Sequence, residues 1–304
     1  MADNPWDGAS GAIEARVARA AATLDLWRDE PEAPTWAFFV PGRIEVLGKH
    51  TDYAGGRSIV SATRQGLCLV ARPRSDARWR MADLTRQMEI DFEIEPGMKP
   101  VRGHWSNYPQ TVARRLLRNF GPELRGADVA FTSDLPRAAG MSSSSTLIVA
   151  VYLVLAKANR LAERDEYRAA IGSLEDLGGY LGSVENGLDF GPLSGEEGVG
   201  TFGGSEDQTA ILCSRLGELQ QYSYCPVRHE RSLRLPDGMR FVVAVSGVHA
   251  SKAGAALGRY NRASLLASTA ASVWREATGF DDPHLAAALE RGSAVVEELR
   301  AALR

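Results

Sequence analysis

One short segment of the chain combines closely spaced glycines with several charged side chains. Residues 41–56 have the sequence PGRIEVLGKHTDYAGG, and the apolar run FFV precedes them at 38–40. Glycine lets the backbone turn and approach a ligand where a Cβ atom would clash. The charged side chains between the glycines can then reach one small polar molecule from several sides. A solvated surface loop would also be polar, but the apolar residues Ile44, Val46 and Leu47 favour a strand followed by a ligand-binding loop.

Composition limits the partners and the compartment. The 304 residues are 44% hydrophobic and 24% charged with a net charge of −3, as in a globular protein of one large or two ordinary domains. No global positive field favours nucleic acid, and we expect none as a partner. The cysteines Cys68, Cys213 and Cys225 are far apart and include no CxxC pair. This argues against a zinc site and a disulfide framework, and it fits a reducing compartment.

The first residues and the hydropathy pattern give the expected location. Residues 1–10 are polar and contain glycine and proline, so they do not resemble a signal peptide. No apolar run approaches the length of a membrane span. We therefore expect a cytoplasmic protein with no membrane partner.

A second cluster, PRAAGMSSSS at 136–145, lies between a predicted strand (128–136) and a predicted apolar helix (142–158). Hydroxyl groups and unpaired backbone N–H groups at a helix start, together with the helix dipole, form a phosphate-binding cradle. A serine-rich N-cap is the alternative, but one serine caps a helix and four in a row exceed that need. The cluster is not a Walker loop, because no GK[ST] follows it.

A third cluster, GTFGGSEDQTAIL at 200–212, places Glu206, Asp207 and Gln208 at a predicted helix start. A carboxylate there suits a general base or an ion ligand, and it equally suits a charge that complements the helix dipole. Glu185 ends the predicted helix before the glycine-rich stretch 187–204. It is either a metal-ligating carboxylate or a solvated acid at a helix end.

Hydrophobic periodicity predicts the remaining elements. The predicted helices are 10–27, 106–120, 165–182 and the last 20 residues, and the predicted strands are 36–40, 43–47, 66–72, 88–94 and 240–247. The last of these strands, RFVVAVSG, is expected to be buried.

Taken together, the clusters resemble the galactokinase branch of the GHMP kinases. Residues 41–56 are similar to the galactokinase signature PGR(V/I)NLIGEHTDYN(G/Q)G, PRAAGMSSSS to the family phosphate loop PxxxGLSSSA, and GGSEDQ to CGxMDQ. HWSNYPQTV at 104–112 is similar to GWxNYxxGV, and VSGVHASK followed by Tyr260 to SNVxHSL followed by a tyrosine. The five motifs occur in family order, and the ordered set is highly specific to the family.

The resemblance implies an α+β GHMP-kinase fold with two domains. An S5-like α/β N-terminal domain over 1–237 would hold all three clusters, and 238–304 would begin a ferredoxin-like C-terminal domain that is incomplete. The family's late GxGxGG motif is missing. The implied activity is ATP- and Mg²⁺-dependent phosphorylation of a sugar or sugar-like polyol at the anomeric hydroxyl. The alternative is a non-catalytic sugar and nucleotide sensor on the same fold, whereas mevalonate or homoserine kinases lack the sugar-binding His-Thr-Asp and are disfavoured.

The resemblance also implies roles for individual residues. Asp207 would take the proton from the sugar hydroxyl, and Arg43 would stabilise the resulting alkoxide. The residues that would bind the sugar are Lys49, His50, Asp52 and Tyr260. Those that would bind the ATP phosphates are Gly140, Ser142, Ser143, Ser144 and Ser145. Ser144 and Glu185 would ligate Mg²⁺, which suits phosphoryl transfer because positioning and charge neutralisation supply most of its catalysis.

Three residues depart from the family pattern. Lys49 replaces a Glu that contacts the sugar near its C6 hydroxyl, Glu45 replaces Asn, and Glu206 replaces Met. A cation at position 49 disfavours galactose and favours a sugar with a carboxylate, such as a uronic acid. The alternative is that Glu45 or Glu206 pairs with Lys49 and turns it away from the pocket. Separately, the stretch DFGPLSGEEG is expected to be an insertion, because it lengthens the spacing between the Glu185 and Asp207 positions.

Overall fold

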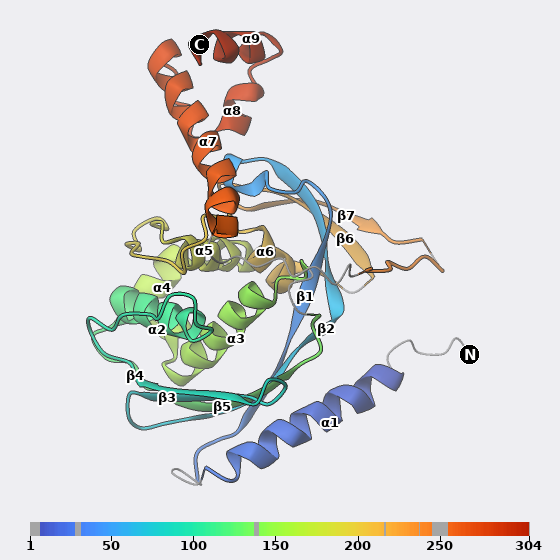
Figure 1. Ribbon diagram of the computed structural model, residues 1–304, viewed down its shortest axis with the longest axis vertical. Coiled ribbons are helices and arrows are strands. Elements are labelled where there is room, and N and C mark those ends of the chain that lie inside the picture. Colours follow the sequence, from blue (N-terminus) through green and yellow to red (C-terminus); the bar gives the residue numbers. More distant parts are fainter. Residues whose placement is uncertain are drawn as a thin grey trace.

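A computed structural model of the chain describes residues 7–27, 32–136, 140–215, 217–236, 238–244 and 255–303. Its centre is a curved sheet (Figure 1). The described strands are β1 (Trp36–Leu47), β2 (Arg57–Pro73), β3 (Arg78–Asp83), β4 (Met88–Glu93), β5 (Ala127–Ser133), β6 (Glu218–Ser223) and β7 (Arg228–Arg234). Their order is β4-β3-β5-β2-β6-β7, and β1 pairs with β2. The long strand β2 pairs with β5 through 67–73 and with β6 through 57–60, so it joins the two halves of the sheet.

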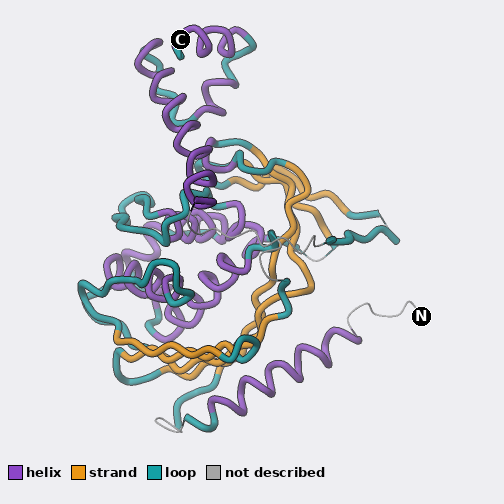
Figure 2. The backbone as a smooth tube through the Cα atoms, viewed as in Figure 1, coloured by secondary structure: helices purple, strands orange, loops and turns teal. Residues whose placement is uncertain are grey.

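Helices cover both faces of this sheet (Figures 1 and 2). One face carries α2 (Asn107–Phe120), α3 (Ser143–Ala158), α5 (Leu174–Asn186) and α6 (Glu206–Cys213), and the other carries α1 (Asp7–Leu24). Successive side chains of a strand point to opposite faces. Leu69 of β2 therefore joins the main core, whereas Val70 packs with Ala20 and Leu24 of α1. Among the residues that the structure describes, no helix has the length and apolar character needed to cross a membrane.

Helix α3 confirms the long apolar helix predicted after the serines. It is buried over most of its length, and Ile148 and Leu155 belong to the main core. It begins after Ser142, whose φ of 57° is in the left-handed region. Thr146 Oγ1 donates to the Pro41 carbonyl at 3.1 Å, which ties the first turn of α3 to β1. The serine cluster therefore lies at a helix N-terminus, as predicted.

Two predicted helices are broken in the structure. The prediction of one helix over 165–182 is wrong, because α4 (Asp165–Ala170) and α5 are separate helices. Ser173 caps α5 by accepting the Asp176 N–H at 3.0 Å. The helix predicted at the C-terminus is divided into α8 (Leu285–Leu289) and α9 (Ala294–Ala302). Gly292, with a φ of 132°, interrupts it in a conformation that glycine adopts readily.

The strand predicted over 240–247 does not form in its described part. Residues 240–244 are not a strand, and the side chain of Val242 is 90% exposed. Residues 245–247 lie outside the described residues. An apolar run becomes a strand only where a neighbour completes its backbone hydrogen bonds, and none of the described strands pairs with this segment. Periodicity also missed β3, β6, β7 and the helix α7 (Ala255–Thr278).

The C-terminal arm, defined here as residues 255–303, projects from the body of the molecule (Figure 1). It consists of α7, α8 and α9, which enclose a small core of Trp274, Ala288 and Val295. The base of α7 contacts the short helix η1 (Asp52–Ala54). The domain boundary expected at 237/238 stays a prediction.

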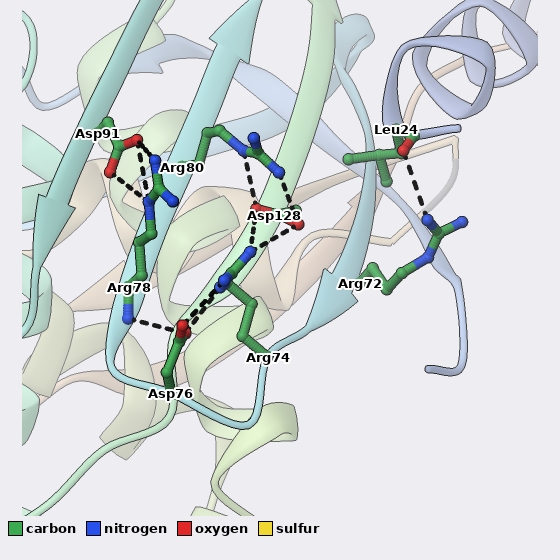
Figure 3. A network of polar contacts seen from close by, with 8 residues as sticks. All are labelled: Leu24, Arg72, Arg74, Asp76, Arg78, Arg80, Asp91 and Asp128. Carbon is green, nitrogen blue, oxygen red and sulfur yellow. Dashed lines mark hydrogen bonds and ion pairs between the residues drawn. The ribbon is translucent and has the colours of Figure 1, made fainter. Parts of the chain in front are cut away.

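An arginine–aspartate network lies on the sheet near the end of α1 (Figure 3). Asp128 of β5 is 2% exposed and accepts hydrogen bonds from Arg74 at 3.2 Å and from Arg80 at 3.0 Å. The guanidinium group of Arg80 also stacks on the ring of Trp27, 4.2 Å from its centroid. The buried Asp128 carboxylate thus pairs with two largely buried cations, Arg74 just after β2 and Arg80 of β3, and Arg74 also pairs with Asp76.

The substitution Asp128→Asn should lower the free energy of unfolding by about 3 kcal/mol or more, because breaking a buried ion pair typically costs that much and Arg74 and Arg80 both lose the buried anion that they share. Urea denaturation measures this loss. Asp165→Asn is the matched control, because Asp165 is 94% exposed in its pair with Arg168 and such a pair is worth less than about 1 kcal/mol. Equal losses in the two variants would show that the network is not an important source of stability.

Candidate active site

An ion pair between Arg43 and Asp207 joins segments 164 residues apart. Arg43 lies on β1, and Asp207 lies in the first turn of α6. Arg43 Nε and Nη2 are 2.7 and 2.6 Å from Asp207 Oδ1. Arg43 Nη1 donates to the Gly140 carbonyl at 2.6 Å, so the same side chain also contacts the loop before α3. One guanidinium group therefore brings together the three sequence clusters.

The hydroxyl of Ser145 connects this pair to Glu185. Ser145 is fully buried, and its Oγ lies 3.2 Å from Asp207 Oδ2 and 3.0 Å from Glu185 Oε2. Glu185, at the end of α5, also accepts from Gln208 Nε2 at 2.6 Å and from Thr201 Oγ1 at 3.3 Å. Glu185 is thus a buried carboxylate of the cluster, and the alternative of a solvated helix-end acid is wrong.

The long spacing between Glu185 and Asp207 does not separate them. The Val199 N–H donates to the Glu185 carbonyl at 2.9 Å, so the loop that follows α5 returns to the end of that helix. Residues 187–198 form a loop between these points, consistent with the expected insertion. Both carboxylates consequently reach Ser145.

The serines occupy distinct positions at the start of α3. Ser142 precedes the helix, and Ser143, Ser144 and Ser145 form its first turn. The first N–H groups of a helix have no acceptor within it and carry the positive end of the dipole. The serines thus lie where a phosphate cradle requires them, and phosphate binding itself stays a prediction. The serine that contacts Glu185 at hydrogen-bond distance here is Ser145, whereas the sequence motif had suggested Ser144 as the metal ligand.

Tyr108 is a site residue to which the sequence assigned no role. Burial and the nearby Glu185 raise the pKa of Tyr108 to about 12, against a hydrogen bond with Ser144 that lowers it. The motif HWSNYPQTV contained the signal, because it places Tyr108 and Asn107 at the start of α2. Tyr108 is thus a neutral phenol beside the serine cluster.

The donor set around Glu185 fits Mg²⁺. In the part of the chain that the structure describes, no three His, Cys, Asp or Glu side chains form a metal cluster. Mg²⁺ is usually bound through one or two carboxylates together with water and substrate phosphates. Glu185 with the Ser145 hydroxyl is an all-oxygen set of that kind, next to the start of α3.

Asp52 links the signature segment to α6. It is 7% exposed, and its Oδ2 accepts the backbone N–H of Glu206 at 3.1 Å. Burial raises the pKa of Asp52, against N–H donors from Glu206 and Tyr53 that lower it. A Cβ atom on Gly204 would lie 2.3 Å from Asp52 Oδ2, which explains why a glycine precedes α6 here.

Glu206 is a second buried acid beside Arg43. It is 4% exposed, its Oε1 lies 3.8 Å from Arg43 Nε, and its Oε2 has no hydrogen-bond partner among the described residues. Burial and the neighbouring Asp52 raise the pKa of Glu206 to about 9, in spite of Arg43. Glu206 is therefore an uncharged carboxylic acid near neutral pH, and the Arg43–Asp207 pair keeps matched charges.

The remaining predicted sugar-binding residues lie outside this buried cluster or outside the described side chains. Lys49 and His50 are exposed in the loop after β1. No ion pair joins Lys49 to Glu45 or Glu206 within the described ranges; Glu45 instead lies 3.8 Å from Arg43 Nη2. The alternative of a neutralised Lys49 therefore has no support. Tyr260 lies on α7, but its side chain is outside the described residues.

The substitution Glu206→Gln should make stability less dependent on pH. Above the ordinary pKa of 4.5 the unfolded chain ionises Glu206, whereas the folded protein keeps it protonated up to about pH 9. The stability that this proton contributes is complete below pH 4.5 and is lost as the pH rises towards 9. Between pH 6 and 8, the free energy of unfolding of Glu206→Gln should rise relative to that of the natural protein by about 1.4 kcal/mol per pH unit, which is the value for one proton.

Urea denaturation across this pH range measures the difference. The exposed Glu166, changed to Gln, is the control and should follow the natural protein. A Glu206→Gln curve parallel to the natural one would mean that Glu206 is ionised in the folded state.

Two family models match this chain. "GHMP kinases N terminal domain" matches residues 107–189, which include the serine cluster and Glu185. "Galactokinase galactose-binding signature" matches residues 28–73, which include Arg43 and Asp52.

Curated relatives point in the same direction. A galactokinase of Chloroflexus aggregans is 31% identical over 248 residues, which are 81% of this chain and 57% of that protein. A galactokinase of Roseiflexus sp. is 40% identical over 121 residues, which are 40% of this chain and 30% of that protein. The chain thus spans little more than half the length of the first of these relatives.

A solved galactokinase structure is similar in fold. The crystal structure of Lactococcus lactis galactokinase complexed with galactose matches with a TM-score of 0.63 and 21% identity, covering 94% of this chain and 70% of that one. At this identity the likeness concerns the fold alone, and it confirms the expected GHMP-kinase fold class.

Proposed function

We propose that this chain, which carries a GHMP kinase N-terminal domain and a galactokinase galactose-binding signature, phosphorylates a sugar or sugar-like polyol with ATP, at the anomeric hydroxyl. The observation that carries the proposal is the contact of Asp207 with Arg43 on one side and with Ser145 on the other. A base, a cation and the phosphate-binding end of α3 then lie within one hydrogen-bonded cluster.

Asp207 acts as the general base. The O–H bond of the sugar hydroxyl breaks, and its proton moves to the Asp207 carboxylate. The sugar oxygen forms a bond to the γ-phosphorus of ATP while the bond between that phosphorus and the bridging oxygen breaks, releasing ADP. Arg43 lies beside the same carboxylate and stabilises negative charge on the sugar oxygen as the proton leaves.

The start of α3 binds the phosphates. The N–H groups and hydroxyls at this helix start, from Ser142 to Ser145, would bind the phosphate oxygens, with Gly140 in the preceding loop. Glu185, together with Ser144 or Ser145, would hold Mg²⁺, which when bound would supply positive charge that neutralises the phosphate oxygens. The hydrogen bonds that Glu185 accepts from Thr201 and Gln208 orient its carboxylate for this role.

The sugar lies between the signature segment and α6. Asp52 accepts hydrogen bonds from sugar hydroxyls on the buried side of the site, and His50 and Tyr260 make the remaining contacts with the sugar. The relatives named above are galactokinases, and this supports a hexose of similar shape. Lys49 replaces an acid of the family pattern and is free of Glu45 and Glu206 in the described part of the chain, which supports an acceptor that differs from galactose at C6.

The substitution Asp207→Asn tests the reaction. In an ATP-turnover assay over a panel of hexoses and uronic acids, it should lower kcat by about two or more orders of magnitude, because a positioned base is typically worth that much. Sugar and ATP binding should change little. The fold of the variant is checked by its thermal unfolding, and Glu166→Gln serves as an active control.

Two results would contradict this proposal. Near-normal turnover by Asp207→Asn would remove the role of Asp207 as base. A natural protein that binds sugar and ATP without consuming ATP would be a sensor instead of a kinase.

Lys49 should set the preference for the acceptor. Lys49→Glu should raise the kcat/KM ratio of galactose over a uronic acid by about tenfold, since a hydrogen bond to a charged group is worth about 1.5–3 kcal/mol. Competition assays with the two sugars measure this ratio. Lys99→Glu is the matched control, because Lys99 is also exposed and lies outside the signature segment. If the natural protein phosphorylates galactose efficiently and Lys49→Glu does not change the preference between the two sugars, Lys49 has no role in substrate selection.

A further inference from the structure

Three asparagine side chains hold the loop 199–203 from three different helices. Asn107 of α2 donates to the Val199 carbonyl at 2.9 Å, and Asn186 of α5 donates to the Gly203 carbonyl at 2.9 Å. Asn261 of α7 donates to the Gly200 carbonyl at 2.9 Å and accepts the Phe202 N–H at 2.9 Å. A primary amide matches a peptide unit in this way because it offers both a donor and an acceptor.

The residue between the two bonds of Asn261 is Thr201. Thr201 is 5% exposed, and its hydroxyl lies 3.3 Å from Glu185 Oε1. Asn261 therefore fixes the backbone on both sides of a residue whose side chain contacts Glu185. Of the three asparagines, Asn261 comes from the C-terminal arm, whereas Asn107 and Asn186 belong to the body of the molecule.

The arm has a second attachment that does not involve this loop. His284 Nε2 lies 3.1 Å from the Cys225 carbonyl, and the His284 ring packs against Gly55 so closely that a Cβ atom there would clash. Arg57 Nη1 lies 3.2 Å from Glu290. Loss of the Asn261 side chain should therefore loosen the loop while the arm stays attached.

We propose that Asn261 is a positioning residue through which the C-terminal arm holds Thr201, and so Glu185, in place at the phosphate end of the site. The inference rests on the proposed function for its kinetic consequence, but the contact itself is independent of activity. It gives the arm a role in the site: α7 determines the backbone conformation of a loop that lies between the arm and the carboxylate proposed to bind Mg²⁺. Asn261 touches neither substrate, and its effect passes through Thr201.

Three variants separate this role from general stability. Asn261→Ala removes both bonds to the loop, and Asn261→Asp retains the acceptor for the Phe202 N–H but loses the donor to Gly200. Ser268→Ala is the matched control, because Ser268 is an exposed polar residue of α7 whose hydroxyl donates to the Leu265 carbonyl of the same helix. Thermal unfolding shows which variants are folded.

Hydrogen exchange of the ligand-free protein measures whether Asn261 holds the loop 199–203. Mass spectrometry of a peptide spanning 199–205 should show faster exchange in Asn261→Ala, an intermediate rate in Asn261→Asp and the natural rate in Ser268→Ala. The Mg²⁺ concentration for half-maximal ATP turnover should rise about tenfold in Asn261→Ala, the lower end of the range for partners of metal ligands, while the KM for the sugar is unchanged.

Each contrary result has a definite meaning. Natural exchange in Asn261→Ala would show that the contact does not hold the loop, and would overturn the inference. Faster exchange with an unchanged Mg²⁺ requirement would show that Asn261 only anchors the arm and is not a positioning residue. Faster exchange with a rise in the sugar KM as large as the rise in the Mg²⁺ requirement would show the same. If the natural protein turns over no sugar, the proposed function fails. Calorimetry of ATP binding at several Mg²⁺ concentrations then takes the place of the turnover assay. If Asn261→Ala shows the same Mg²⁺ dependence as the natural protein in that measurement, the inference is overturned.

Discussion

The guanidinium group of Arg43 is the centre on which the candidate site depends. Two charges 4 Å apart interact by about 4 kcal/mol at an effective dielectric constant of 20, so a largely buried cation requires close anions. Asp207 supplies the closest, and Glu45 and Glu206 lie 3.8 Å away. Burial acts to lower the pKa of Arg43, but these carboxylates outweigh it and raise the pKa above its ordinary value. Arg43 thus holds β1, the start of α3 and the start of α6 at one point.

An excess of acid around that cation has a physical consequence. Glu45, Glu206 and Asp207 lie within 4 Å of the Arg43 guanidinium group, and Asp52 accepts the backbone N–H of Glu206. These carboxyl groups cannot all be charged at low cost, and burial together with the neighbouring Asp52 raises the pKa of Glu206, whose Oε2 has no hydrogen-bond partner among the described residues. A site built in this way keeps one matched ion pair, Arg43 with Asp207, for the chemistry. Replacement of the family's apolar residue by Glu206 therefore changes the electrostatics of the site less than its formal charge implies.

Two helix N-termini and one long loop complete the arrangement. α3 presents the serine cluster and α6 presents Asp207, while the loop after α5 returns to Glu185 before α6 begins. The asparagines that hold this loop connect its backbone to α2, α5 and α7. The loop is thus a structural bridge between the carboxylate at one end of the site and the C-terminal arm.

The sequence by itself determined the three clusters, their order and the kinds of side chain that they contain. Ser142 was correctly expected at a helix start, and Asp207 in a helical first turn, because four serines after Gly140 and acids after two glycines are local signals of a helix N-terminus. The family resemblance and the α+β fold class followed from the same motifs. The broken helices at Ser173 and Gly292 were missed because a cap interrupts a periodic pattern without changing its apolar positions.

Only the tertiary structure decided which of these residues meet. Ser145 contacts Glu185, Asn261 contacts the Thr201 loop, and Glu206 is buried against Arg43. Each of these contacts joins segments that are 40 to 163 positions apart, and a local pattern carries no information on such distances. These contacts depend on the pairing of β2 with β1, β5 and β6, because the sheet places β1 against the starts of α3 and α6. Protonation of Glu206 likewise depends on burial among neighbours that come together only in the folded chain.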